Sequence, residues 1–156
     1  MKSVPGAFLL VSLALAGCAT SPDARAPAPS TAQEAAPRNR LDERIAWYAR
    51  AYDVPESLID RVIRRESGFN PAAHHGPFWG LMQIRLETAR GMGYRGPPRG
   101  LLDADTNLKY AVAYLANAWL VAAGNPDRAV ALYASGYFYA ARRKGLLDRL
   151  RTAEPG

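Results

Sequence analysis

The chain has 156 residues, of which 49% are hydrophobic and 22% are charged. This length allows one domain of ordinary size, and the composition excludes both a disordered polymer and a protein with several membrane spans. The 20 basic and 14 acidic residues give a formal net charge of +6, which favours an anionic partner. Cys18 is the single cysteine, so an intrachain disulfide framework and a thiolate metal site are excluded.

Residues 1–17 combine a basic end with a short apolar run. Lys2 provides the positive end, and residues 7–16 form an apolar run that is shorter than the roughly 20 residues a bilayer span needs. The run ends at Leu-Ala-Gly-Cys (residues 15–18), where small residues precede the cysteine. The segment resembles the signal peptide of a bacterial lipoprotein, which implies lipidation of Cys18 and stable membrane anchoring. A conventional signal peptide with an incidental cysteine is the alternative.

Residues 18–40 are predicted to be a lipidated N-terminus followed by a flexible linker. Ala, Pro, Ser and Thr dominate the segment, which lacks the large apolar side chains that a core requires. As a coil, the linker would reach roughly 25 Å. Ala19 is not the aspartate that commonly retains lipoproteins at the inner membrane, so the resemblance implies a periplasmic protein anchored to the outer membrane.

Residues 41–150 have helical periodicity and are predicted to form one all-α domain. No alternating run is long enough to predict a strand. Residues 103–106 offer capping side chains for the longest helix, with Asp103 the first of them, and Asn125 followed by Pro126 has the order of an N-cap and a first helical residue. The expected elements are helices over residues 41–52 and 55–66, turns over 67–77, a short helix over 81–90, a loop over 91–100, a central helix over 103–122, and helices over 126–134 and 137–149.

Glu66 occupies an unusual place for a carboxylate. The residues three, four and seven positions before it are Ile63, Val62 and Ile59, so helical geometry directs the carboxylate along the apolar face of its helix. Apolar surroundings and the negative end of the helix dipole both favour the protonated acid, as a general acid requires. An ion pair with an arginine such as Arg65 is the alternative that this geometry leaves open.

Three sequence blocks stand at and after Glu66: Glu-Ser-Gly-Phe-Asn-Pro-Ala-Ala at residues 66–73, Gly-Leu-Met-Gln-Ile at 80–84 and Ala-Leu-Tyr-Ala-Ser-Gly at 131–136. With these blocks the chain resembles the domain of the soluble lytic transglycosylases, and the similarity extends over about residues 41–145. It implies a lysozyme-like fold and cleavage of the β-1,4 bond between N-acetylmuramic acid and N-acetylglucosamine in peptidoglycan. The implied product ends in 1,6-anhydromuramic acid, and no metal or organic cofactor is implied.

The resemblance also implies roles for individual residues. Glu66 matches the catalytic acid and base of the family, which needs no second carboxylate. Gly80 and Gln83 match the block that lines the saccharide groove, and Met82 belongs either to that groove or to the core. Tyr133 matches a tyrosine near the catalytic acid. Four other acids of the domain are expected to be caps or solvated groups: Glu87, Asp103, Asp105 and Asp127.

Two departures from the family pattern leave alternatives open. Residues 74–79 (His-His-Gly-Pro-Phe-Trp) replace a stretch that usually carries a serine and is one residue longer, and Ala134 replaces an asparagine. His75 is a candidate replacement for the missing hydroxyl, the alternative being a solvent-exposed histidine. The departures support one alternative function, a non-catalytic peptidoglycan-binding scaffold lipoprotein on the same fold. A muramidase-type hydrolase that admits water is a further alternative.

The expected partners follow from the export signal and the resemblance. They are peptidoglycan glycan strands, a membrane reached through the lipid on Cys18, and a cell-wall or secretion complex. Nucleic acid is not expected, because no motif supports it and export conflicts with it. A metal site is not expected either, because the histidines have no third ligand at a recognisable spacing. The basic run at residues 142–144 is expected to be a solvated helix face.

Overall fold

The computed structural model describes the backbone of residues 31–153 and the side chains of residues 38–153. This part of the chain is mainly helical, with one small antiparallel sheet, which confirms the predicted fold class. The predicted signal peptide, Cys18 and the first part of the linker lie outside the described residues. The elements are α1 (Thr31–Tyr52), α2 (Glu56–Glu66), β1 (His74–His75), β2 (Phe78–Trp79), β3 (Ile84–Arg85), α3 (Leu86–Gly91), η1 (Pro98–Leu102), α4 (Ala104–Val121), α5 (Pro126–Ser135), α6 (Phe138–Arg143) and η2 (Leu147–Arg149).

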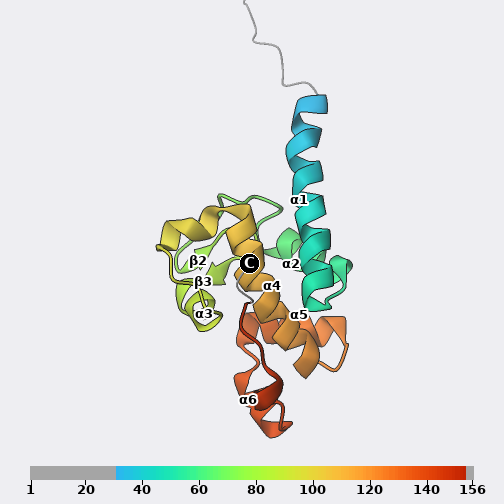
Figure 1. Cartoon of the computed structure of the whole chain (residues 1–156), viewed down its shortest axis with the longest axis vertical. Helices are drawn as coiled ribbons and strands as arrows, with labels where there is room; N and C mark the ends of the chain where they lie inside the picture. The colour runs from blue at the N-terminus through green and yellow to red at the C-terminus, as the bar shows by residue number, and fades with distance from the viewer. Residues whose placement is uncertain (1–30, 154–156) are drawn as a thin grey trace, which may run out of the picture.

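Helix α1 begins ten residues before the predicted start of the domain, and its first turns project beyond the rest of the fold (Figure 1). Before Leu41 the helix contacts the turn after α2, since the Arg38 guanidinium carbon lies 4.0 Å from the centre of the Phe69 ring. Within α1, Arg38 Nε lies 3.4 Å from an Asp42 carboxylate oxygen. The end of the predicted linker is therefore helical. Within residues 31–153, no helix has the length and hydropathy that crossing a membrane requires.

Helix α4 is the central helix of the fold and packs against α1, α3, α5 and η1. Its buried face repeats at helical spacing, as the sequence predicts, and includes Leu108, Val112 and Leu115. The predicted N-cap is confirmed, since Asp103 Oδ1 accepts a 2.8 Å hydrogen bond from the Thr106 backbone. The predicted cap of α5 is also confirmed: Asn125 Oδ1 accepts a 2.9 Å bond from the Arg128 backbone.

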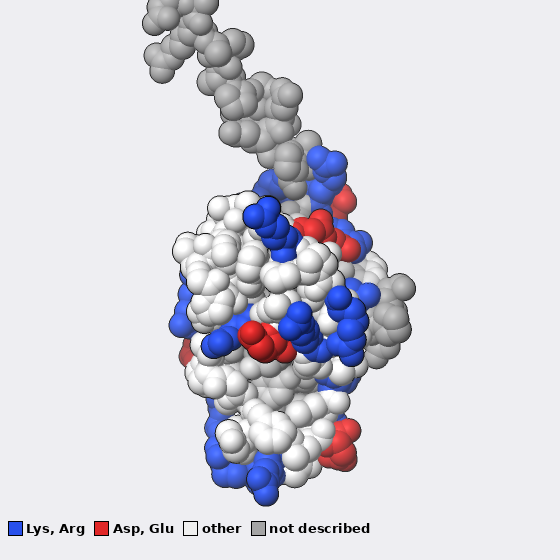
Figure 2. All heavy atoms as spheres, turned by 90° about the vertical axis from the view of Figure 1, so that its left-hand side faces the viewer, with Lys and Arg blue, Asp and Glu red and all other residues white. Residues whose placement is uncertain are grey.

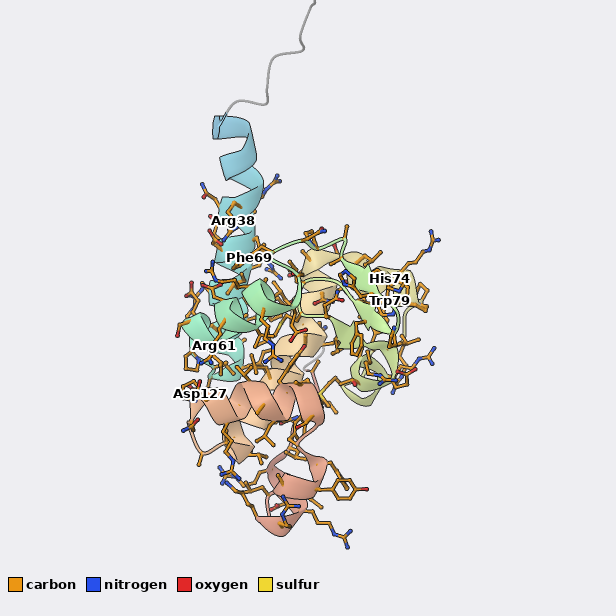
Figure 3. The ribbon with its side chains drawn as sticks, turned by 180° about the vertical axis from the view of Figure 1, so that it is seen from behind. Arg38, Arg61, Phe69, His74, Trp79 and Asp127 are labelled. Carbon is orange, nitrogen blue, oxygen red and sulfur yellow. The ribbon has the colours of Figure 1, made fainter. Side chains whose placement is uncertain are left out.

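Strands β1, β2 and β3 form an antiparallel sheet in chain order, beside α3 (Figure 1). Each strand has two residues, which is too short for an alternating pattern to appear in the sequence. The predicted helix over residues 81–90 is wrong in its first half: residues 80–83 form a turn, Gln83 has a φ of 48°, and α3 begins only at Leu86. The His74 and Trp79 rings stack at 3.7 Å on this hairpin (Figure 3).

A buried asparagine of α4 holds the turn after β2. Asn107 is fully buried, and its Nδ2 donates 2.8 Å hydrogen bonds to the carbonyl oxygens of Trp79 and Leu101. Its Oδ1 accepts a 2.9 Å bond from the Met82 backbone N–H. Gly80 has a φ of 70°, and a Cβ there would lie 2.2 Å from the Leu101 oxygen. This close packing fixes the position of the turn against the central helix.

The helices at the two sides of the fold are joined by ion pairs. Nη2 of Arg61 in α2 lies 2.7 Å from Oδ1 of Asp127 in α5 (Figure 3). Arg44 of α1 pairs with Asp105 of α4. Asp105 and Asp127 are 50% and 79% exposed, which fits the solvated role that the sequence predicts, whereas the two ion pairs were not predicted.

The C-terminal part differs from the single helix predicted over residues 137–149. It is divided into α6 and η2, because the chain turns at Gly145 with a φ of 64°. The basic run of residues 142–144 is exposed, but its last member also caps α4. Lys144 Nζ donates a 2.7 Å hydrogen bond to the carbonyl oxygen of Val121, at the end of that helix.

Candidate active site

A cleft of about 370 Å³ lies between α2, the sheet and α5. Its wall includes Glu66, Gln83 and Tyr133, three of the residues predicted for the site. Among the described residues that line it, Glu66 is the only carboxylate. The structure places no cluster of three metal-ligating side chains within the described part of the chain. The other lining residues are Arg65, Phe78, Ile84, Arg85, Thr88, Tyr114, Ala134, Ser135 and Gly136.

Glu66 is the last residue of α2, where the helix leaves the core. The residues one and two turns before it, Ile63 and Ile59, are completely buried, whereas the Glu66 side chain keeps 26% of its surface exposed. The helix ends because Gly68, with a φ of 59°, returns its N–H to the Ile63 carbonyl oxygen. The Glu66 carboxylate therefore lies at the edge of the hydrophobic core and faces the cleft.

Arg65 lies beside this carboxylate, as the alternative interpretation of the sequence anticipated. Its Nε is 3.6 Å from Glu66 Oε1, which is longer than a hydrogen bond, and the arginine side chain is 58% exposed. An exposed ion pair of this length contributes little to stability. Glu66 therefore lines the cleft with a guanidinium close by but without a tight partner among the described residues.

Tyr133 projects from α5 into the base of the cleft and is buried. Its hydroxyl donates a 2.8 Å hydrogen bond to the carbonyl oxygen of Met82. Burial raises the pKa of Tyr133 well above its ordinary value, and the nearby charge of Glu66 raises it further. The phenol is therefore neutral, and its proton is directed at the backbone of the turn, so its oxygen remains free only as an acceptor.

Gln83 has all of its polar side-chain atoms engaged within the protein. Its Nε2 donates to the carbonyl oxygens of Ala73 (3.0 Å) and Gly80 (2.8 Å). This orientation directs Oε1 at His75 Nδ1, 2.8 Å away, so that Nδ1 carries the hydrogen. Gln83 lines the cleft, and its side-chain amide connects Ala73, just before β1, with Gly80, just after β2.

The remaining predicted site residues do not line the cleft. Met82 is completely buried, and its backbone carbonyl accepts the hydrogen bond from Tyr133. Gly80 is buried against Leu101 and Asn107. His75 is exposed on β1 and contacts Gln83. In this structure the three residues support the lining residues instead of forming part of the cleft wall.

Several lining residues were not predicted as site residues from the sequence. Tyr114 comes from α4 and packs edge-on against Tyr133, with ring centres 5.4 Å apart. Arg85 of β3 is another; it lies opposite Phe78 of β2, one of several aromatic residues that the sequence offered as surfaces for sugar stacking without assigning them individually. The one sequence feature that could have indicated Arg85 as a site residue is its position directly after the Gly-Leu-Met-Gln-Ile block. Ala134 also lines the cleft, so this departure from the family pattern falls inside the site.

Comparison with known proteins identifies a family and a group of relatives. The family model described as "Transglycosylase SLT domain" matches residues 43–151. Similar proteins named "Membrane-bound lytic murein transglycosylase C" occur in Klebsiella pneumoniae subsp. pneumoniae, Salmonella typhi and Cronobacter sakazakii. Each is 37% identical over 106 residues, in an alignment that covers 56% of this chain and only 29% of the relative. No solved structure gives a significant match.

Proposed function

The chain belongs to the transglycosylase SLT domain family, and we propose that it is a peptidoglycan lytic transglycosylase with Glu66 as its acid and base. The observation that carries the proposal is the position of Glu66, which is the single carboxylate among the described residues lining the cleft. A glycosidase that activates water commonly uses two carboxylates on opposite sides of the sugar. One carboxylate fits a reaction in which the substrate supplies its own nucleophile.

The proposed reaction consumes no water. Protonated Glu66 gives its proton to the glycosidic oxygen between N-acetylmuramic acid and N-acetylglucosamine, and the bond from the anomeric carbon to that oxygen breaks. The C6 hydroxyl oxygen of the muramic acid forms a new bond to the anomeric carbon, and ionised Glu66 accepts the hydroxyl proton. The products are a 1,6-anhydromuramoyl end and a free C4 hydroxyl, and Glu66 returns to its protonated form.

Tyr133 is proposed to position the acid. Its hydroxyl proton is already donated to Met82, so the phenol oxygen can accept a hydrogen bond from protonated Glu66 or from a sugar hydroxyl. The Met82 bond keeps the phenol in one orientation, which supports this role.

The location and partners of the protein form part of the proposal. Processing at Cys18 would leave a lipid-anchored protein in the periplasm, attached to the outer membrane and acting on glycan strands. The relatives' name, which begins "Membrane-bound", supports membrane association. Recruitment by a cell-wall or secretion complex belongs to the same proposal.

The test is digestion of purified sacculi, followed by mass spectrometry of the released fragments. The wild-type protein is expected to release anhydromuropeptides, and Glu66→Gln is expected to abolish release without changing the helical circular dichroism. Glu43→Gln, which removes an exposed carboxylate on α1, serves as the control. Fragments heavier by one water molecule would instead identify a muramidase-type hydrolase. Binding to sacculi without release would identify a scaffold protein.

A further inference from the structure

We infer that Arg85 makes the cleft selective for glycan strands whose peptide stems carry free carboxylates. The inference rests on the proposed function, because it assigns a substrate class to the same cleft. The first observation is the charge of the residues that line the cleft. Two guanidinium groups, Arg65 and Arg85, line the cleft with one carboxylate, Glu66, so the wall has an excess of positive charge.

The strand pairing places Arg85 on the cleft wall. Ile84 of β3 is buried, and because successive side chains of a strand point to opposite faces, Arg85 points away from the core with 54% of its surface exposed. Its cross-strand partner is Phe78, and the guanidinium carbon lies 5.8 Å from the centre of that ring. The two side chains therefore combine an apolar ring and a cation on one edge of the cleft.

The guanidinium of Arg85 is available to a ligand. It lies next to Glu87, with 3.6 Å between Nε and Oε2, and the Glu87 side chain is 72% exposed. This distance exceeds that of a hydrogen bond, and an exposed pair of this kind is weak. A carboxylate in the cleft can form two parallel hydrogen bonds with a guanidinium, and these are stronger than the present contact.

The chemistry of peptidoglycan supplies such a carboxylate. The N-acetylated sugars of the glycan are neutral, and so is the lactyl carboxyl where it forms the amide bond to a stem, whereas the stem peptides carry carboxylates. The face of the protein that carries the sheet and α3 shows more basic than acidic side chains (Figure 2), which attracts an anionic strand. A sugar ring next to Phe78 would bring its stem within reach of Arg85.

The test measures binding by the full-length Glu66→Gln protein, which cannot consume its ligand. Two synthetic tetrasaccharides are titrated by calorimetry: they are identical except that one has stems with free carboxylates and the other has stems with carboxamides. We expect the carboxylate form to bind about tenfold more tightly, as a charge-assisted hydrogen bond allows. Adding Arg85→Gln is expected to remove this preference and leave carboxamide binding within about twofold. Adding Arg85→Lys is expected to keep part of it.

The matched control is Arg90→Gln, which removes the same charge from the exposed surface of α3 outside the cleft wall. It is expected to keep the preference. The inference is overturned if Arg85→Gln keeps the preference, if it weakens both ligands equally, or if neither ligand binds. Failure of the proposed function is seen separately, as absence of sacculus cleavage by the wild-type protein while the Arg85-dependent preference persists.

Discussion

The hydroxyl of Tyr133 donates a 2.8 Å hydrogen bond to the carbonyl oxygen of Met82, a residue 51 positions earlier in the chain. The bond joins α5 to the turn between β2 and β3. Both segments line the cleft, so one buried contact sets the separation of two parts of its wall. Its removal affects both the stability of the domain and the geometry around Glu66.

Tyr133→Phe is expected to lower the free energy of unfolding by about 1–3 kcal/mol, because the buried Met82 carbonyl loses its donor. The same change is expected to reduce the rate of glycan cleavage, since the phenol oxygen next to Glu66 is lost. Urea denaturation and a sacculus assay measure the two effects. Tyr139→Phe, at a side chain that is 72% exposed, is expected to change neither. A Tyr133→Phe protein as stable and active as the wild type would contradict the assigned role.

Gly80→Ala is expected to destabilise the protein far more than Gly76→Ala. Both glycines have a positive φ, 70° and 59°, so the backbone cost of about 1 kcal/mol is shared. A Cβ at Gly80 would also lie 2.3 Å from Asn107 Nδ2, whereas a Cβ at Gly76 would meet no atom within 4 Å. The free energy of unfolding is expected to fall by more than about 2 kcal/mol further in Gly80→Ala than in Gly76→Ala, as measured by thermal or urea denaturation. Equal losses at the two positions would show that the turn moves freely against α4.

His75→Ala is expected to reduce cleavage without preventing folding, because His75 acts on the cleft through Gln83. The variant leaves Gln83 Oε1 without its 2.8 Å donor. The expected cost is about 1 kcal/mol in stability, with a rise in KM larger than the fall in kcat. His75→Asn, whose side-chain amide can also donate, is expected to restore part of the activity. Equal activities of the two variants would remove this positioning role.

The stability of the protein is expected to fall in strongly alkaline solution. Burial raises the pKa of Tyr48 and of Tyr137 to about 12, whereas an exposed tyrosine ionises near about 10. The unfolded chain therefore releases these protons first. The contribution of these tyrosines to the free energy of unfolding is complete below pH of about 10 and falls as the pH rises toward about 12.

Urea denaturation at several pH values between about 8 and 12 measures this loss. Each buried tyrosine contributes up to roughly 2–3 kcal/mol to it. Tyr137→Phe is expected to flatten the alkaline slope, and Tyr139→Phe, at an exposed ring, is expected to leave it unchanged. An unaltered slope in Tyr137→Phe would show that other groups cause the alkaline loss.

The main helices and their caps were predictable because their signals are local. Asp103 and Asn125 cap backbone N–H groups three residues away, and the apolar stripe of α2 repeats within one or two turns. The hairpin was not predictable from periodicity, since its strands have two residues each. For the same reason, the predicted helix over residues 81–90 began too early.

The sequence by itself determined the helical class, the position of Glu66 at the end of an apolar stripe, and the family blocks around it. Only the tertiary structure decided that Met82 is core, that the Gln83 amide is engaged internally, and that Arg85 and Tyr114 line the cleft. The physical reason is the separation in sequence of the residues that interact. Helical faces depend on neighbours within about four residues, whereas the cleft wall depends on strand register and on contacts such as that from Asn107 to Met82, which span 25 positions.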